Sequence, residues 1–454
     1  MTERVIVRRG AYYDSVTLML VSRAAAGEDG AHDVAVGMAT PLNLELLAGQ
    51  GFGVEDGLGP NDLVIAVRAR DEAAADAAVA AVDRELATKG GAQAAVADRP
   101  ATRSLASAAR RDPDLSVAFL SIPGEHVATE AAAALEAGLH VFCFSDGVSL
   151  EVEAALKRRA LERDLLFMGA DCGTAIVDGV ALGFANAVGR GPVGIVGASG
   201  TGIQEVSCLL DAAGIGVSHA IGVGGRDLSA RVGGLMMRRG LELLAADEDT
   251  RAIVAISKPP DAAVAAAIED VAAGAGKPVI LALSDDVTLE QAAAHAAELV
   301  GGALPPFTTG LRHPPARGAV RGLYSGGTLC AEAARIVGAG EFTDFGADEY
   351  TQGRAHPMID LSLRLEHLAA AARDPGVSVL LLDVVLGYGA HPDPAGELAP
   401  TIGAMDKHVI VALCGAAGDP QGIDGQQETL ERSGAVVTRS NAHAARLARE
   451  ASGG

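Results

Sequence analysis

Short apolar runs and amphipathic stretches alternate along nearly the whole chain. Apolar runs bounded by turn residues are typical of strands, and apolar positions repeating every three or four residues are typical of helices. Strands that alternate with helices favour parallel sheets with crossover helices on their faces. The pattern therefore predicts an α/β protein with several sheets in succession.

Residues 1–90 are predicted to form a first domain, a small α/β sandwich of ferredoxin-like type. Asp14 and Asp71 are candidate N-caps for two of its helices. No glycine-rich phosphate fingerprint follows its first strand. The predicted strands cover residues 4–8, 33–38 and 62–68, and the predicted helices cover 14–24, 41–49 and 71–88.

Residues 91–190 are predicted to form a second, Rossmann-like domain, in which 91–112 supply a linker and one helix. Parallel strands joined by crossover helices are the simplest arrangement for this part of the chain. The predicted strands cover residues 115–121, 139–144 and 164–168, and the predicted helices cover 124–137 and 149–162.

Two further domains, 191–303 and 319–454, are predicted to be repeats of one another, separated by the proline-rich loop 304–318. Each reads as four strand–helix pairs, which is typical of a flavodoxin-like, doubly wound sheet. Ligands of such sheets bind beyond the carboxyl ends of the strands. Three anchors recur in the same order: Ser199-Gly200 with Ser325-Gly326, Asp227-Leu228-Ser229 with Asp360-Leu361-Ser362, and Lys277 with Lys407.

Each repeat opens with an apolar run, a turn rich in Ser and Gly, and an amphipathic stretch. A helix that begins at such a turn directs unpaired amides and the positive end of its dipole at a ligand, and small residues let an anion approach. We therefore expect one phosphate-sized anion between two facing helix N-termini; ordinary capped helices are the alternative. Lys258, after another strand, is a weaker candidate for an anion contact. The predicted phosphate-binding residues are Ser199, Gly200, Thr201, Gly202, Ser325, Gly326, Gly327 and Thr328.

Two loops of the second repeat contain candidate catalytic residues. His391 and Asp393 follow an apolar strand at its carboxyl end, where a histidine can act as a general acid or as an electrostatic clamp. Asp383, at the end of that strand, could orient a donor. The alternative is a proline-rich surface loop with a solvated histidine. His356 is a candidate helper that could reach a ligand carboxylate.

The segment around His356 also allows a purely structural interpretation, in which Asp360 caps the next helix. The matching segment of the first repeat has Arg226 and Asp227 but no histidine. The two repeats are therefore not chemically equivalent, as expected for one active site at a pseudo-twofold interface.

Composition limits the class of protein. The 454 residues are 49% hydrophobic, include 57 glycines and carry a formal net charge of −22, which argues against nucleic acid or an anionic membrane as partner. The five cysteines form no CxxC pair and fit a reducing compartment. No metal-ligand spacing, targeting segment or long apolar span is found, so we expect a cytoplasmic protein without a metal site.

Ordered motifs resemble the NDP-forming acyl-CoA synthetases, typified by the succinyl-CoA synthetase α subunit. The similar stretches are IPGEHVATEAAAALEAGLHVFCFSDGVSLEVEAALKRRA, LLFMGADCGTAIVDG and GPVGIVGASGTGIQEV. The second repeat, with HPMID at 356–360 and GYGAHPDPAG at 387–396, resembles one branch, the FdrA proteins. The resemblance implies that 91–190 is of the CoA-binding type and that both repeats are of the ligase type.

The chain departs from the synthetases at two points. No glycine-rich CoA-phosphate loop precedes residue 115, and His295 lies in a helical Ala/Glu stretch where the synthetases carry a phosphorylated histidine in a glycine-rich loop. The FdrA resemblance instead implies a subunit of a heteromeric oxamate carbamoyltransferase of allantoin breakdown, which converts oxalurate and phosphate into oxamate and carbamoyl phosphate. Its ligand would be phosphate or carbamoyl phosphate, and its partners would be other protein subunits. An acyl-CoA synthetase subunit that binds CoA and a non-catalytic scaffold are the alternatives.

Overall fold

The computed structural model describes residues 1–454 except 12, 14, 56, 95–101, 103, 317, 352, 353 and 454. The predicted cap Asp14 lies outside the described residues. The chain divides into two compact units, Met1–Arg103 and Ser104–Gly454. The boundary expected at residue 90 differs, because the last helix of the first unit continues to Ala94.

The first unit contains a three-stranded sheet in the order β1-β3-β2, with β3 antiparallel to both neighbours. β1, the following helix and β2 thus form the split β-α-β unit of a ferredoxin-like fold. Along β3, Ile65 and Val67 pack with α1 and α3, whereas Val64 and Ala66 contact the α2 side, as the two-residue period of a strand requires. The elements are β1 (Thr2–Arg8), α1 (Ser15–Ala26), β2 (Ala31–Met38), α2 (Pro41–Gly49), β3 (Leu63–Ala69) and α3 (Glu72–Ala94).

The second unit begins with a Rossmann-like part, a parallel sheet in the order β4-β5-β6. A hairpin, β7 and β8, follows it and pairs through β7 with β10 of the next sheet. The sequence pattern places these residues in the domain 91–190 and predicts no strands there, but their hydrogen bonds place them in the sheet of the first repeat. The elements are α4 (Leu105–Arg111), β4 (Val117–Leu120), α5 (Gly124–Glu136), β5 (His140–Cys143), α6 (Leu150–Leu161), β6 (Phe167–Met168), β7 (Thr174–Val177) and β8 (Val180–Gly183).

The first repeat has the four predicted strand–helix pairs. Its sheet runs β12-β11-β9-β10-β7-β8, in which the first four strands are parallel. The elements are β9 (Arg190–Gly197), α7 (Gly200–Ala212), β10 (Val217–Gly222), α8 (Leu235–Ala246), β11 (Ala252–Ile256), α9 (Ala262–Ala273), β12 (Val279–Ala282) and α10 (Leu289–Leu299).

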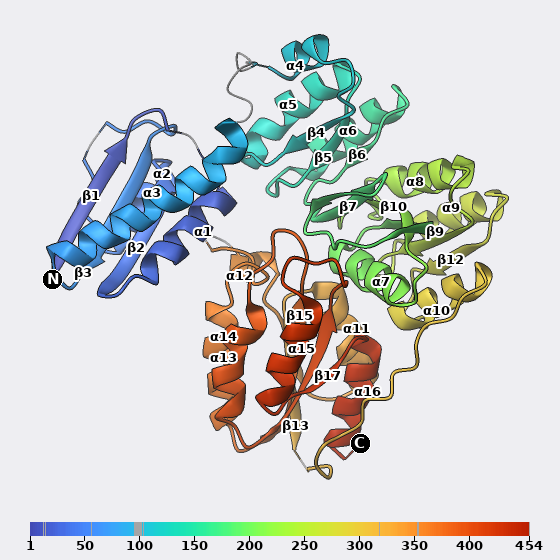
Figure 1. Ribbon diagram of the computed structural model, residues 1–454. Helices are drawn as coiled ribbons and strands as arrows, with labels where there is room; N and C mark the ends of the chain where they lie inside the picture. The colour runs from blue at the N-terminus through green and yellow to red at the C-terminus, as the bar shows by residue number, and fades with distance from the viewer. Residues whose placement is uncertain are drawn as a thin grey trace. The chain divides into compact units, whose positions relative to one another are not determined.

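The second repeat is a five-stranded parallel sheet in the order β14-β13-β15-β16-β17, the order of a flavodoxin-like fold. Helices cover both faces, with α13, α14 and α15 on one and α11 and α16 on the other (Figure 1). The predicted fold class is confirmed, with one strand more than expected. The elements are β13 (Ala319–Tyr324), α11 (Gly327–Val337), β14 (Glu341–Asp344), α12 (Asp348–Thr351), α13 (Ser362–Arg373), β15 (Val377–Val385), α14 (Pro394–Gly403), β16 (His408–Cys414), α15 (Ile423–Arg432), β17 (Val436–Thr438) and α16 (Asn441–Ala451).

Two lysines show that the repeats are equivalent in three dimensions. Lys277 precedes β12, and its Nζ donates to the carbonyl oxygens of Leu244 and Asp247 at the end of α8. Lys407 precedes β16, and its Nζ donates to the carbonyl of Asp374 at the end of α13. A lysine at a helix C-terminus satisfies carbonyls that lack an intrahelical donor.

The repeats pack against each other through α7 and α10 of the first and α11 and α16 of the second. A glutamate on each turn-bearing helix caps the last helix of the other repeat. Glu205 of α7 accepts from the Asn441 amide at 2.8 Å, and Glu332 of α11 accepts from the Leu289 amide at 2.7 Å. This reciprocal capping fixes the starts of α7 and α11 relative to one another.

In the part of the chain that the structure describes, every helix is too short or too polar to span a lipid bilayer.

Candidate functional site

The two Ser-Gly turns lie in direct contact. Ser199, which precedes α7, has its Oγ 2.7 Å from Oγ1 of Thr328 in the first turn of α11. A Cβ added to Gly326 would lie 2.7 Å from Cγ2 of Thr201. The starts of α7 and α11 therefore face each other, as the sequence predicts, with side chains rather than an open cleft between them. Binding of phosphate at this junction stays a prediction.

On the α7 side, Ser199 is the N-cap, and its Oγ accepts from the Gly202 amide at 2.9 Å. Gly200 is the first helical residue, and a Cβ there would lie 3.0 Å from Oγ1 of Thr174. Thr174 is only 1% exposed, and this oxygen has no hydrogen-bond partner among the described residues. An unpaired buried hydroxyl is costly unless something else satisfies it. The α7 turn thus holds a polar group for which the described residues supply no partner.

On the α11 side, a carboxylate of the chain already occupies part of the turn. Asp383, fully buried at the end of β15, accepts from the amides of Ser325 at 2.8 Å and Gly326 at 2.9 Å. It also accepts from the Ser325 hydroxyl at 3.0 Å and pairs with Arg364 at 3.0 Å. Asp383 was expected to orient a donor, and it orients three. The amides of Gly327, Thr328 and Leu329, the first three residues of α11, precede the first intrahelical bond, which the Cys330 amide makes to the Gly326 carbonyl at 2.8 Å.

Three further side chains lie beside the turns. A Cβ on Gly327 would meet the Asp344 carboxylate and lie 3.4 Å from Nζ of Lys258. A Cβ on Gly346 would lie 2.9 Å from Nε2 of His356 and 3.1 Å from Oδ1 of Asp344. Lys258, His356 and Asp344 therefore surround the start of α11. Sequence reasoning missed Asp344, because a single Asp at the end of a short strand carries no motif.

The protonation of this group follows from its burial. Burial, helped by the charge of Arg364, lowers the pKa of His356 to about 4, so the ring is neutral near pH 7. Nδ1 accepts from the Met358 amide at 3.2 Å, which leaves the proton on Nε2, the nitrogen that faces Gly346. Burial also raises the pKa of Asp344, against the opposing effects of the Gly346 amide and Lys258. The site thus pairs a neutral imidazole donor with a carboxyl that holds its proton more tightly than usual.

His391 and Asp393 hold their own loop in place. His391 is 5% exposed, its Nδ1 accepts from the Asp393 amide at 3.0 Å, and its Nε2 lies 2.9 Å from Glu397. The alternative of a solvated histidine is therefore wrong. Asp393 is the N-cap of α14, accepting from the Gly396 amide at 3.0 Å and from Gln426 at 2.9 Å. The described contacts give both residues a positioning role, and a catalytic role for them stays a prediction.

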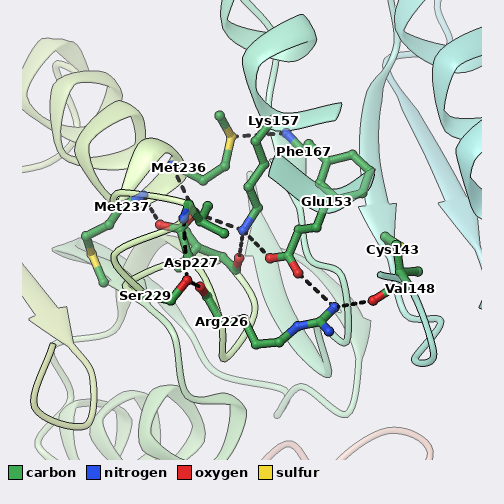
Figure 2. A network of polar contacts seen from close by, with 12 residues as sticks. Cys143, Val148, Glu153, Lys157, Phe167, Arg226, Asp227, Ser229, Met236 and Met237 are labelled. Atoms are coloured by element: carbon green, nitrogen blue, oxygen red, sulfur yellow. Dashed lines mark hydrogen bonds and ion pairs between the residues drawn. The ribbon is translucent and has the colours of Figure 1, made fainter. Parts of the chain in front are cut away.

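Arg226 and Asp227 belong to a buried network of charges between α6 and the loop before α8 (Figure 2). Lys157, fully buried, donates to Glu153 and to Asp227, each at 2.8 Å. Asp227 also caps α8 through the amides of Met236 and Met237 at 3.2 and 2.9 Å. Arg226 pairs with Glu153 at 2.8 Å. These contacts connect the Rossmann-like part to the first repeat.

The corresponding residue of the second repeat behaves differently. Asp360 is exposed and accepts from the Ser362 amide at 2.9 Å, one position before the N-cap Leu361. The predicted Asp360 cap is therefore displaced by one residue. This difference from Asp227 agrees with the expectation that the two repeats are not chemically equivalent.

Family comparisons cover most of the chain. The family model described as "AllF, heavy metal-associated domain" matches residues 1–101, "CoA binding domain" matches 189–284, and "CoA-ligase" matches 323–451. The uncharacterized protein YahF of Escherichia coli (strain K12) is 36% identical, over 99% of this chain and 98% of that protein. This chain belongs to the YahF family.

Two CoA ligase subunits are more distantly similar to this YahF-family chain. The ADP-forming sulfoacetate-CoA ligase subunit SauD of Bilophila wadsworthia is 29% identical over 33% of the chain and 52% of that subunit. The succinate–CoA ligase subunit alpha 1 of Archaeoglobus fulgidus is 28% identical over 34% and 52%. The chain thus spans about half the length of either subunit. The similarity to the succinyl-CoA synthetase α superfamily is confirmed.

The matches also bear on the domain assignment. The CoA-binding match lies in the first repeat, whereas the CoA-binding type was expected for residues 91–190. The segment 1–101, matched by the heavy metal-associated model, contains no cysteine and a single histidine, His32. Among the described residues, no three His, Cys, Asp or Glu side chains are grouped so that they could hold a metal ion.

Proposed function

We propose that this YahF-family chain is a subunit of a heteromeric carbamoyltransferase that binds phosphate or carbamoyl phosphate at the two Ser-Gly turns. The observation that carries the proposal is the 2.7 Å contact between the hydroxyls of Ser199 and Thr328. It brings the positive ends of α7 and α11 to one point, where backbone amides favour an anion. The unpaired Thr174 hydroxyl and the nearby Lys258 ammonium favour the same ligand.

Phosphorolysis of oxalurate needs groups that hold phosphate and a group that donates a proton, and the residues at the two turns are of these kinds. In phosphorolysis of oxalurate, a phosphate oxygen attacks the carbamoyl carbon, the carbon–nitrogen bond breaks, and the oxamate nitrogen takes up a proton. Positioning of phosphate by amides and hydroxyls supplies most of what such a transfer needs. His356, neutral with its proton on Nε2, would donate a hydrogen bond to the substrate carbonyl or to the leaving nitrogen. Asp344, which lies beside the Gly327 turn and whose pKa is raised by burial, is the candidate proton donor.

The name AllF in the family model for residues 1–101 favours a role in allantoin breakdown. A second candidate function, that of an NDP-forming acyl-CoA synthetase subunit, is favoured by the CoA-binding and CoA-ligase matches. His295 counts against it, because it is exposed within helix α10 rather than in a glycine-rich loop at the turns. A non-catalytic scaffold is the third candidate, favoured by Asp383, which already occupies the amides of Ser325 and Gly326.

Calorimetric titration of the full chain with inorganic phosphate, carbamoyl phosphate and CoA separates these candidates. Thr328→Val removes a hydroxyl at the junction while keeping the side-chain shape. We expect it to weaken phosphate binding about 10- to 100-fold, the usual effect of losing one hydrogen bond to a charged group. Ser199→Ala should weaken binding as well, but it also removes a helix cap.

The matched control is Ser149→Ala, since Ser149 is the N-cap of α6 and accepts from the Val152 amide. Both serine variants lose one cap, yet only Ser199→Ala should lose phosphate binding. Binding of CoA without any detectable binding of phosphate would favour the synthetase function. The absence of binding of all three ligands, with and without partner subunits, would favour the non-catalytic scaffold.

A further inference from the structure

Two cysteines from different repeats lie in contact at the interface of α7 with the second sheet. Cys208 is on α7, and Cys414 ends β16, and their sulfur atoms are 4.0 Å apart. They are 5% and 1% exposed. The sulfur–sulfur distance in a disulfide is about 2.05 Å, so the two sulfur atoms would have to approach by about 2 Å.

A cavity gives small molecules a route to one member of the pair. It has a volume of about 230 Å³ and is lined by Cys208, by residues 305–309 of the loop between the repeats, and by β17 residues. Cys414 is not among its lining residues. Thr438, one of those β17 residues, is buried, and its hydroxyl has no partner among the described residues. A reagent in this cavity would therefore meet Cys208 first.

We propose that Cys208 and Cys414 form a modification site at which exchange with a small organic disulfide links the two repeats covalently. The Cys208 sulfur, after losing its proton, attacks the reagent RS–SR, so that a mixed disulfide forms and RS⁻ leaves. The Cys414 sulfur then attacks the Cys208 sulfur and expels the second RS⁻. Each RS⁻ takes up one of the two thiol protons, giving one protein disulfide and two RSH.

The link would tie two elements that carry the phosphate junction. α7 begins at the Ser199 turn, and β16 belongs to the sheet whose first strand leads into the Ser325 turn. Burial raises the pKa of the Cys208 thiol, and the hydrogen bond with Cys208, together with burial, raises the pKa of the Cys414 thiol, so the exchange is slow and needs the reagent in excess. The proposal does not depend on the proposed function, because it concerns only the thiol pair and its cavity.

The test treats the reduced full chain with excess 2-hydroxyethyl disulfide and follows free thiols and non-reduced peptides by mass spectrometry. We expect the loss of two of the five free thiols and a Cys208–Cys414 peptide pair lighter by two hydrogens. In the Cys414→Ser variant the reaction should end at the mixed disulfide, with one reagent group on Cys208. Cys208→Ser should leave Cys414 unmodified.

Cys330→Ser is the control, because Cys330 lies on α11 and is not one of the lining residues of this cavity. It should leave the cross-link unchanged. Reagent spread evenly over all five cysteines would mean that modification follows unfolding, and would overturn the proposal. So would a stable reagent adduct on Cys208 that never passes to Cys414.

Discussion

Glu205 should make the free energy of unfolding depend on pH. Its side chain is 2% exposed between the two repeats, and its Oε1 accepts from the Asn441 amide at 2.8 Å. Burial outweighs that hydrogen bond and, together with the nearby charge of Glu332, raises the pKa of Glu205 from 4.5 to about 8. The side chain is therefore mostly protonated in the folded protein at pH 7.

The sign and size of the effect follow from proton linkage. Between pH 4.5 and 8 the folded chain binds a proton that the unfolded chain has released, so the free energy of unfolding falls as pH rises. Each unit of pKa corresponds to about 1.4 kcal/mol, which gives a total of about 5 kcal/mol across this window. Glu205→Gln removes the titration while keeping an oxygen that accepts from the Asn441 amide. The free energy of unfolding of Glu205→Gln, relative to that of the wild type, should therefore increase by about 1.4 kcal/mol for each unit by which pH rises.

Guanidinium denaturation followed by circular dichroism at pH 5, 6, 7 and 8 measures this difference. Titrating groups that do not interact with Glu205 cancel in it, whereas Glu332, which is coupled to Glu205, contributes a smaller part. Glu298→Gln is the control, because Glu298 is an exposed residue of α10. The free energy of unfolding of Glu298→Gln should differ from that of the wild type by the same amount at every pH. Parallel curves for Glu205→Gln as well would refute the reasoning, since they would mean that Glu205 is ionised in the folded protein.

Of three other expectations, the first two are measured by denaturation and the third by the resonances of one histidine ring. Gly326→Ala should destabilise the protein by about 1–3 kcal/mol, because its Cβ would meet Thr201 at 2.7–2.9 Å. Gly425→Ala should stabilise the protein by about 0.5–1 kcal/mol, because Gly425 lies in α15 and an added Cβ would have no atom within 4 Å. A Gly425→Ala variant that is less stable than Gly326→Ala would contradict the packing argument. Asp383→Asn should cost about 3–5 kcal/mol, because it leaves a buried arginine without its partner; an unchanged denaturation midpoint would contradict this. Because the pKa of His356 is lowered to about 4, the folded protein should lose up to about 1.4 kcal/mol per unit as pH falls from 6.5 to 4. The ring resonances of His356 should therefore stay constant from pH 8 to 5.5, and a shift in that range would disprove the assignment.

The arrangement within each repeat could be predicted because its signals are local. Apolar runs and amphipathic stretches indicate which residues face a core, and short βα connections restrict how neighbouring elements pack. Lys277 and Lys407 illustrate this, since each lysine reaches carbonyls at the end of a helix in its own repeat. Four strand–helix pairs were predicted for the second repeat and five strands are observed, of which β17 has only three residues.

The candidate site could be predicted only in part. The Ser199 and Ser325 turns were identified because Ser-Gly turns before helices carry a recognisable composition. Asp344 was not identified, because its position beside the Gly327 turn depends on how β14 lies in the sheet. Asp393 was expected near the chemistry, yet an Asp that caps a helix and one that binds a ligand have the same sequence neighbours.

The sequence by itself determined the α/β class, the order of the elements, the internal repeat and the two turns, because each of these is encoded in short windows or in similarity between windows. Only the tertiary structure decided that Ser199 meets Thr328, that Glu205 caps α16, and that the sulfurs of Cys208 and Cys414 touch. An apolar face indicates that a helix is buried but not what it is buried against, because the hydrophobic effect is not directional. Contacts between residues more than a hundred positions apart depend on how the two sheets of this unit pack together, and that packing leaves no periodic pattern in the chain.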